Sequence, residues 1–202
     1  MENHPVEVAE RGSLALVTYI PDPLSTFLHD LRLLLPGDHY ALPHVTILPP
    51  RPLRTSIESA SRAAQSVLER FPSFEIELCQ VNCFPQTNVL YLNLAHGHSE
   101  LHHLHDALNT GELAHPEKFE FLPHVTLEGP VPSSSMDAAR ERVELAWSSA
   151  TCPPKFTVRE VVCLWLSPTA VWGDWQRLWS QVLGTGAVSA DHAAAAVTGQ
   201  TY

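Results

Sequence analysis

The sequence predicts an α+β fold of two similar lobes that share one cleft. Segments with strand-like and helix-like patterns alternate along its 202 residues, and one short segment occurs twice. The segment LPHVTI at residues 42–47 recurs as LPHVTL at residues 122–127, so five consecutive residues are identical. Because strand, helix and strand follow one another around both copies, we expect an internal duplication. We expect residues 1–183 to form a single two-lobed domain and residues 184–202 to form a mobile tail.

The first half of the chain alternates between strand and helix. Apolar runs rich in β-branched and aromatic residues are typical of buried strands, and apolar residues at spacings of three and four are typical of helices. Thr55 and Glu58 form a capping box, which marks a helix N-terminus. Prolines at 49, 50 and 52 should end the strand before them, because proline cannot donate to a β-ladder. These patterns predict strands over 13–20 and 42–48 and helices over 24–35 and 55–68.

The second half continues the same alternation. Phe74, Ile76 and Leu78 alternate with glutamates, as in a half-buried strand, and residues 89–95 fit its hairpin partner. Ser134 followed by Asp137 marks the start of a further helix. The remaining patterns predict a helix over 101–108, a strand over 119–127, a helix over 134–147 and one long strand over 156–166. Residues 175–183 fit either a partner strand or a last helix, and we favour the strand.

Composition and charge narrow the class of protein. Apolar residues make up 45% of the chain and charged residues 17%, which is ordinary for a globular protein. A formal net charge of −10 disfavours an extended nucleic-acid surface, because such a surface neutralises many phosphates with Lys and Arg. No apolar run approaches the roughly 20 residues that span a bilayer, and the acidic N-terminus lacks the basic region of a secretion signal. We therefore expect a cytoplasmic monomer that does not bind membranes, with reduced thiols at Cys79, Cys83, Cys152 and Cys163.

The repeated motif carries the candidate chemistry. Side chains alternate between the two faces of a strand, so His44 and Thr46 should project from one face while their neighbours project into the core. The second copy presents His124 and Thr126 in the same way. If the duplication brings the two strands together, one cleft holds two imidazoles and two hydroxyls.

That set of side chains suits displacement at phosphorus. A neutral imidazole can take a proton from the attacking water or hydroxyl, an imidazolium can protonate the departing oxygen, and threonine hydroxyls can donate to non-bridging oxygens. Histidine titrates near pH 6.5, so both forms are accessible near neutrality, and no metal or other cofactor is required. We expect His44 and His124 to be catalytic and Thr46 and Thr126 to bind the phosphate. We assign His124 as base and His44 as acid, and these roles exchange if the substrate binds in the reverse sense.

The paired motifs resemble those of the two-histidine phosphoesterase superfamily, which includes the bacterial 2'-5' RNA ligases and the cyclic nucleotide phosphodiesterases. The resemblance implies two antiparallel sheets around a central cleft with helices outside, and a metal-free mechanism. It also implies a small nucleotide or RNA-end substrate, with 2',3'-cyclic phosphates opened to 2'-phosphates, or with 2'-5' linkages. Glu128 stands directly after the second motif, where many relatives carry a small or basic residue. A carboxylate at the cleft mouth argues against a long polyanion and therefore against RNA end-joining.

Other side chains are candidates for substrate contact. Arg51 follows the first motif and Lys118 precedes the second, so either could meet a phosphate or a base, although solvated loop charge is the simpler interpretation. Tyr40, Phe84 and Trp165 could stack on a nucleobase, while core packing is the simpler interpretation for the tryptophans. The sequence does not choose among the aromatic residues.

Three alternatives compete with the phosphodiesterase hypothesis. His98, His102 and His105 share one face of a predicted helix and could ligate a transition metal, but no H-E-x-x-H pattern accompanies them. A non-catalytic module that senses a nucleotide or RNA end could use the same pocket, but it would not need a paired acid and base. A 2'-5' RNA ligase would need the same pair as a hydrolase, so the sequence leaves that alternative open.

Overall fold

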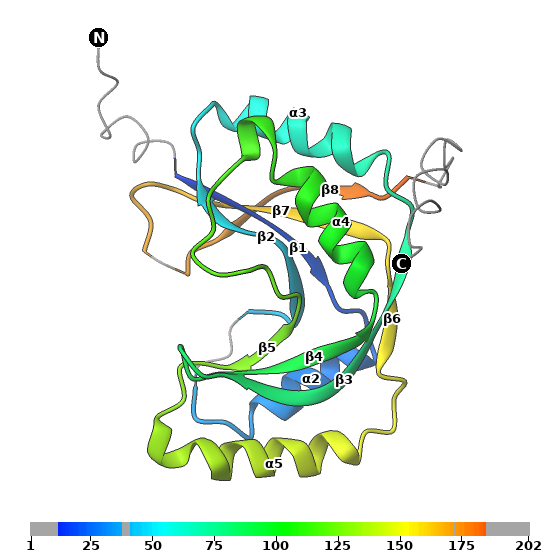
Figure 1. The fold of residues 1–202 in the computed structure, drawn as a ribbon, viewed down its shortest axis with the longest axis vertical. Coiled ribbons are helices and arrows are strands. Elements are labelled where there is room, and N and C mark those ends of the chain that lie inside the picture. The colour runs from blue at the N-terminus through cyan, green and yellow to red at the C-terminus, as the bar shows by residue number, and fades with distance from the viewer. Residues whose placement is uncertain (1–11, 38–40, 172, 185–202) are drawn as a thin grey trace, which may run out of the picture.

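In the part of the chain that the structure describes, eight strands form two four-stranded sheets (Figure 1). This computed structural model describes residues 12–37, 41–171 and 173–184. The first sheet has the order β2 (His44–Pro52), β1 (Ser13–Tyr19), β7 (Glu160–Leu166) and β8 (Gln176–Val182). The second has the order β5 (Val125–Glu128), β4 (Val89–His96), β3 (Phe74–Phe84) and β6 (Lys155–Val158). All neighbouring strands in both sheets are antiparallel, which confirms the predicted α+β class and the two antiparallel sheets.

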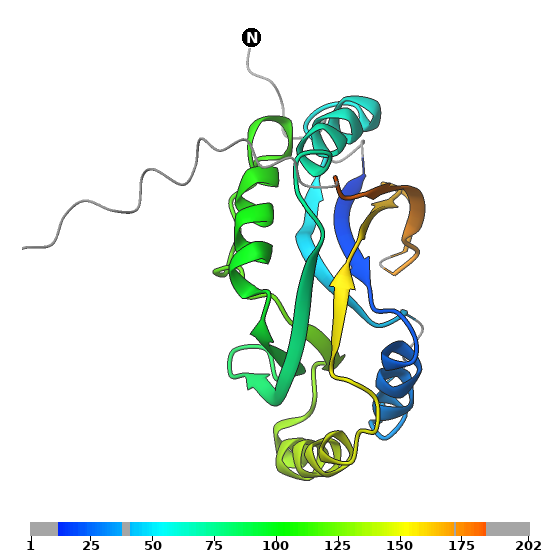
Figure 2. The ribbon, with the colours of Figure 1, turned by 90° about the vertical axis from the view of Figure 1, so that its right-hand side faces the viewer.

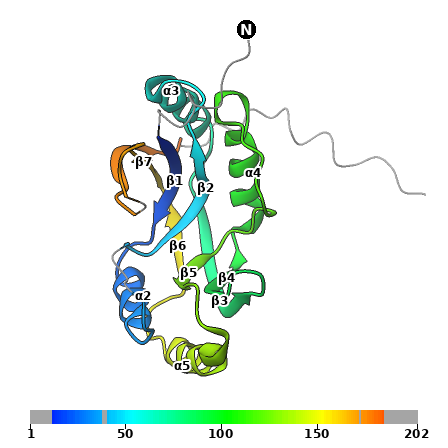
Figure 3. The ribbon, with the colours of Figure 1, turned by 90° about the vertical axis from the view of Figure 1, so that its left-hand side faces the viewer.

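The four α-helices of the described ranges form two pairs. α2 (Leu24–Arg32) packs against α5 (Met136–Ser148), and α3 (Ile57–Leu68) packs against α4 (His98–Leu108). Figures 2 and 3 show α3 and α4 together toward one end of the molecule and α2 and α5 at the other. Two 3-10 turns, η1 (Gly111–Leu113) and η2 (Ser133–Ser135), follow α4 and precede α5.

Three predicted helix starts are wrong by one to three residues, and the helix predicted over 101–108 begins at His98. The N-cap of α3 is Ser56 rather than Thr55, and its side chain accepts a hydrogen bond from the backbone N–H of Ser59. α5 begins at Met136 rather than Ser134, because the η2 turn occupies the preceding residues. Each helix nevertheless buries the apolar face that its spacing predicts.

Three predicted strand limits are also wrong. β2 continues past residue 48 to Pro52, because it is an edge strand, where prolines can sit without removing a ladder hydrogen bond. Residues 119–124 are not strand, and only the segment from Val125 onward pairs with β4. The predicted long strand over 156–166 is interrupted at Arg159, and its two parts pair in different sheets.

The connections explain how the repeated motifs come together. α2 joins β1 to β2, yet it packs against β5 in the other sheet. α4 joins β4 to β5, yet it packs against β2. Each strand–helix–strand unit therefore places its helix on the motif strand of the other unit, which is the arrangement expected of a duplicated pair.

One buried apolar cluster extends through both sheets and all four α-helices. The cysteines are free thiols, as predicted, and burial raises the pKa of Cys163 to about 12. Gly184 forms a bridge with Pro72, so it belongs to the fold rather than to a tail, and residues 185–202 lie outside the described residues. None of the helices in the described ranges is long and apolar enough to cross a bilayer.

Candidate active site

The two motif strands lie at equivalent edges of their sheets and contact each other. β2 ends the first sheet and β5 ends the second. Val45 and Val125 are fully buried, as are the apolar residues two positions later. The polar members of the motifs are half-buried: His44, Thr46, His124 and Thr126. The predicted alternation of side chains is therefore confirmed in both copies.

Both motif histidines bond to the backbone in the same way. Nδ1 of His44 lies 2.8 Å from the carbonyl oxygen of Leu42, and Nδ1 of His124 lies 2.7 Å from that of Leu122. A carbonyl oxygen can only accept, so each Nδ1 carries a hydrogen and donates it. In each ring, Nε2 is therefore the nitrogen left to exchange a proton with a substrate.

Aromatic rings from the neighbouring strands lie edge-on to both imidazoles. Tyr19 pairs with His44 across β1 and β2, and its ring meets that imidazole edge-on with centroids 6.1 Å apart. In the other lobe Phe84 and Tyr91 stack at 4.1 Å, and they meet His124 edge-on at 5.0 and 5.3 Å. Together with the Nδ1 hydrogen bonds, these contacts fix the orientation of both rings.

Burial lowers the pKa of both motif histidines. For His44 desolvation is the largest cause, the hydrogen bond to Leu42 opposes it, and the charges of Arg32 and His124 lower the pKa further. For His124 desolvation again lowers the pKa, and the hydrogen bond to Leu122 opposes it. The two imidazoles are therefore electrostatic neighbours, and Arg32 makes them unequal.

Arg32 is a site residue that the sequence analysis missed. It lies at the end of α2, is only 5% exposed, and crosses to the other lobe, where Nε and Nη2 donate to the carbonyl oxygen of Thr126. Its Nη1 donates to the carbonyl oxygen of Ala41, 2.8 Å away and just before the first motif. One buried cation thus ties the two motifs together. Nothing in the local sequence distinguishes it from an ordinary arginine on a helix surface.

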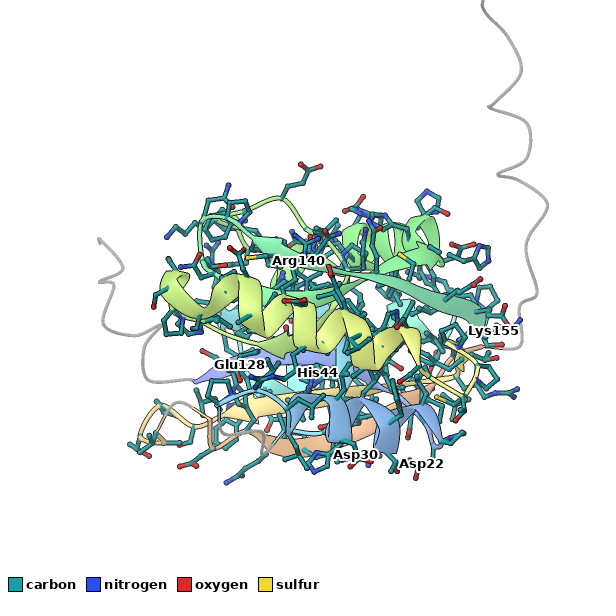
Figure 4. All side chains as sticks on the ribbon, turned by 90° about the horizontal axis from the view of Figure 1, so that it is seen from below. Asp22, Asp30, His44, Glu128, Arg140 and Lys155 are labelled. Carbon is teal, nitrogen blue, oxygen red and sulfur yellow. The ribbon has the colours of Figure 1, made fainter. Side chains whose placement is uncertain are left out.

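Glu128 bridges the two lobes. Its carboxylate accepts hydrogen bonds at 2.9 Å from the backbone N–H groups of Gly37 and Gly129. Burial lowers the pKa of Arg32, and the charge of Glu128 opposes that shift. A Cβ at position 37 would lie 2.3 Å from Oε1 of Glu128, so a larger residue there would displace the Glu128 carboxylate. In Figure 4 the labels of His44 and Glu128 fall between α2 and α5. Glu128 is not among the residues that line the cavity described next, although its neighbour Gly129 is, so its effect on a polyanion stays a prediction.

A cavity of about 950 Å³ opens beside the motifs. Thr46, His124 and Thr126 line it, whereas His44 is not among the lining residues and is linked to the site through its electrostatic contact with His124. The other walls come from β2, the β3–β4 hairpin, α4 and the connection between α4 and β5, which can be followed in Figure 1. This volume is at the upper end of the range for small-molecule sites, about 300–1,000 Å³.

Arg51 is not the solvated loop charge that the sequence suggested. It lies within β2, and its side chain is 2% exposed. Its guanidinium donates to Oδ1 of Asn109, to the carbonyl oxygen of Leu113 and, at 2.6 Å, to Oε1 of Glu117. Arg51 does line the cavity, but its hydrogen bonds tie β2 to the connection that leads into β5.

The structure separates the other candidate contacts. Phe84 and Lys118 line the cavity, and the Lys118 ammonium lies 5.1 Å from the ring centroid of Phe119. Trp165 is not among the lining residues and borders a separate hollow at the start of α3. Tyr40 lies outside the described residues.

The three α4 histidines proposed as metal ligands have different partners. His105 is buried between Asp106 and Glu117 and stacks on Phe121 at 4.0 Å. His98 and His102 stack on each other at 4.7 Å. Within the ranges that the structure describes, no group of three or more His, Cys, Asp or Glu side chains is placed to hold a metal ion.

The two sheets and the repeated motifs with their paired imidazoles are the features expected of the two-histidine phosphoesterase superfamily. The model of the 2'-5' RNA ligase superfamily matches residues 20–170, and the chain belongs to that family. A protein of Geobacillus thermodenitrificans named as a phosphoesterase is 27% identical over 111 residues, which are 53% of this chain and 64% of the relative. Another protein named as a phosphoesterase, from Halalkalibacterium halodurans, is 31% identical over 93 residues, which are 44% of this chain and 54% of the relative. The chain thus spans between half and two thirds of these relatives.

Solved structures of similar proteins share the fold. The structures of E. coli LigT with phosphate and with 3'-AMP each match with a TM-score of 0.59 at 20% identity, over 87% of this chain and 99% of LigT. A further phosphoesterase crystal structure matches with a TM-score of 0.61, also at 20% identity and with the same coverage. These likenesses show that the bilobal fold is that of LigT.

Proposed function

We propose that this protein is a metal-independent phosphodiesterase that hydrolyses small nucleotide phosphodiesters by paired-histidine acid–base catalysis. Nucleoside 2',3'-cyclic phosphates, opened to 2'-phosphates, are the first substrate class, and 2'-5' linkages are the second. The identical anchoring of the two imidazoles carries the proposal. The phosphate and 3'-AMP complexes of LigT support a small nucleotide substrate.

The anchoring matters because it leaves one nitrogen per ring for chemistry. Nδ1 carries a hydrogen in both the neutral and the charged imidazole, so its bond to the carbonyl oxygen persists when the ring gains or loses a proton. Only Nε2 changes its protonation state. Two such rings that face one phosphate can act as base and acid without moving.

The charges around the motifs favour His44 as the base and His124 as the acid, the reverse of our assignment from sequence. Burial lowers the pKa of His44, and the buried Arg32 cation lowers it further and so favours the neutral form of this ring. Nε2 of His44 takes a proton from water, and the water oxygen attacks phosphorus. The bond from phosphorus to the ribose 3'-oxygen breaks on the opposite side, and Nε2–H of His124 protonates that oxygen.

The threonines of the motifs supply donors for the phosphate. Thr46 and Thr126 both line the cavity, each two residues after a motif histidine and on the same strand face. Their hydroxyls can donate to the non-bridging oxygens as negative charge develops there. The Arg32 bonds to the Thr126 carbonyl oxygen hold the second of these residues in place.

The test is turnover of the four nucleoside 2',3'-cyclic phosphates and a 2'-5' dinucleotide in EDTA. We expect wild type to open at least one cyclic phosphate, and His44→Ala and His124→Ala each to lose a factor of about 10² or more. The matched control is His29→Ala, an exposed histidine on α2, which should keep wild-type turnover. Circular dichroism verifies that each variant is folded.

The other outcomes identify the alternatives. Activity lost on chelation and restored by added metal would contradict the metal-free mechanism. Binding of nucleotides without turnover by wild type would identify a non-catalytic module. Joining of RNA ends in place of hydrolysis would identify a ligase.

A further inference from the structure

The cavity continues past the motif residues to three histidines that the proposed mechanism does not use. His98 and His102 lie in the first two turns of α4, and His115 lies in the connection between α4 and β5. We call these three residues the histidine wall. They line the same cavity as Thr46 and Thr126, so one substrate can contact both regions.

The nitrogens of His98 and His102 are available to a ligand. Their rings stack with centroids 4.7 Å apart, and His102 meets Phe121 edge-on at 5.2 Å. Neither ring makes a hydrogen bond to any residue that the structure describes. His105, one turn further along, is instead held by hydrogen bonds to two carboxylates. The stacked pair therefore offers imidazole nitrogens that the fold does not use.

In His115, Nε2 is the ring nitrogen that can donate a hydrogen bond to a ligand. Its Nδ1 is buried and has no hydrogen-bond partner among the described residues. A buried N–H without an acceptor is unfavourable, so the hydrogen of the neutral ring belongs on Nε2. Nε2–H is then the donor that this ring keeps for a ligand.

The fixed charges around the wall nearly cancel. Besides the histidines, the described charged residues that line the cavity are Arg51, Glu117, Lys118 and Glu120. Arg51 and Glu117 form an ion pair at 2.6 Å, and Arg54 acts on His115 from outside the lining. Protonation of the histidine wall and of His124 therefore sets the sign of the charge in the cavity.

Protonation of the wall depends on what it binds. Burial lowers the pKa of His98, and the neighbouring His102 lowers it further. Burial also lowers the pKa of His115, as do Arg51 and Arg54, while Glu117 opposes them. An anion placed against these rings favours their charged forms, so its binding takes up protons and strengthens as the pH falls.

We propose that the histidine wall is a second anion subsite, which binds a phosphate group of the substrate other than the one that reacts. This inference rests on the proposed function and narrows its substrate class. The preferred substrates carry two phosphate groups, as a nucleoside 2',3'-cyclic phosphate with a 5'-phosphate does. The cyclic phosphate meets the two motifs, and the 5'-phosphate accepts hydrogen bonds from the imidazoles of the wall and from Lys118 at its edge.

Calorimetric binding of the two products tests the subsite without turnover. The ligands are a nucleoside 2'-monophosphate and the matching 2',5'-bisphosphate, measured at pH 6 and pH 8. We expect the bisphosphate to bind wild type about tenfold more tightly at pH 6, as one charge-assisted hydrogen bond would supply. This preference should shrink at pH 8, although the phosphate itself gains charge above its second pKa of about 6.

Two variants test whether the histidine wall causes the preference for the bisphosphate. His98→Asn combined with His102→Asn should bring the ratio of the two affinities close to one. His103→Asn, an exposed histidine of the same helix that does not line the cavity, should keep the wild-type ratio. Far-UV circular dichroism reports whether α4 is intact in both.

The outcomes separate this inference from the proposed function. A ratio that does not change with pH, or that survives in the double variant, overturns the second subsite whether or not the protein hydrolyses cyclic phosphates. If wild type turns over no cyclic phosphate but shows the expected pH-dependent preference, the proposed function fails and the anion subsite stands.

Discussion

Two histidines with the same backbone bonds can have different roles, because one buried cation acts on only one of them. Burial lowers the pKa of both rings and the backbone carbonyls of Leu42 and Leu122 oppose it, but the charge of Arg32 lowers further only the pKa of His44. The pseudo-twofold repeat supplies two equal rings, and a residue outside the repeat makes them unequal. The direction of catalysis across the cleft can therefore be tested at Arg32.

Replacing Arg32 by Gln should move the acid limb of the pH profile of kcat/KM to higher pH. The acid limb reports the base, which must be neutral, and loss of a nearby cation raises the pKa of His44. The measurement is kcat/KM from pH 5 to 9 on the preferred cyclic phosphate. Movement of the alkaline limb alone would instead make His44 the acid.

The conservative variant Arg32→Lys separates charge from positioning. Both variants leave the carbonyl oxygens of Thr126 and Ala41 short of donors, so both should lose about 1–3 kcal/mol of stability. Only the glutamine variant loses the charge. We expect the lysine variant to keep the wild-type acid limb, and equal shifts in both variants would count against an electrostatic role.

For individual residues, the sequence predicts the placement of the side chains within the two motifs and little of the site beyond them. Alternation along a strand is a local property, so the shared face of His44 and Thr46 follows from their spacing. Arg32 escapes prediction because its partner Thr126 is 94 residues away. Arg51 was misinterpreted because the prolines around it suggested a loop, while the edge position of β2 tolerates them.

At the level of helices and strands, buried hydrogen bonds and an ion pair hold β2 against the connection from α4 to β5. Arg51 reaches from β2 to Glu117, and the same carboxylate oxygen lies 3.0 Å from Nε2 of His105 on α4. Three elements thus share one carboxylate in a site with little solvent access. Removal of that charge would leave the guanidinium of Arg51 buried without a counter-ion.

Glu117→Gln should therefore destabilise the protein by about 3–5 kcal/mol, as expected when one partner of a buried ion pair is removed. The matched control is Glu144→Gln, which breaks the exposed ion pair with Arg140 on α5 and should change stability by less than about 1 kcal/mol. Urea unfolding measures both through the midpoint at constant m-value. Similar small losses in the two variants would show that the buried pair contributes no more than a surface pair.

Periodicity predicted the described α-helices and the strand regions, but it could not assign strands to sheets. The run over 156–166 is apolar enough for one strand, yet it passes from β6 in one sheet to β7 in the other at Arg159. That break depends on which partner strands are available on each side, a tertiary property that no local pattern records.

For the whole molecule, the reciprocal packing of α2 on β5 and α4 on β2 joins the lobes at the motifs themselves. Separation of the lobes would expose the apolar core and break the bonds of Arg32 and Glu128 across the cleft. Site geometry and global stability are therefore coupled. The repeat in the sequence predicted two lobes, but the exchange of helices between them follows only from the three-dimensional fold.

Burial of neutral histidines in this shared cleft should make the protein less stable as the pH falls below about 6.5. Each histidine with a lowered pKa binds a proton more readily when unfolded, and this applies to His44, His98, His115 and His124. Their contribution is fully present above the unfolded pKa of about 6.5 and is lost as the pH falls through the folded pKa values. The free energy of unfolding in urea should thus be lower at pH 5.5 than at pH 7.5, a range in which most carboxylates stay ionised. The variant with both motif histidines changed to Gln should lose part of this dependence, and a stability that is level or higher at pH 5.5 would contradict the buried neutral state of the pair.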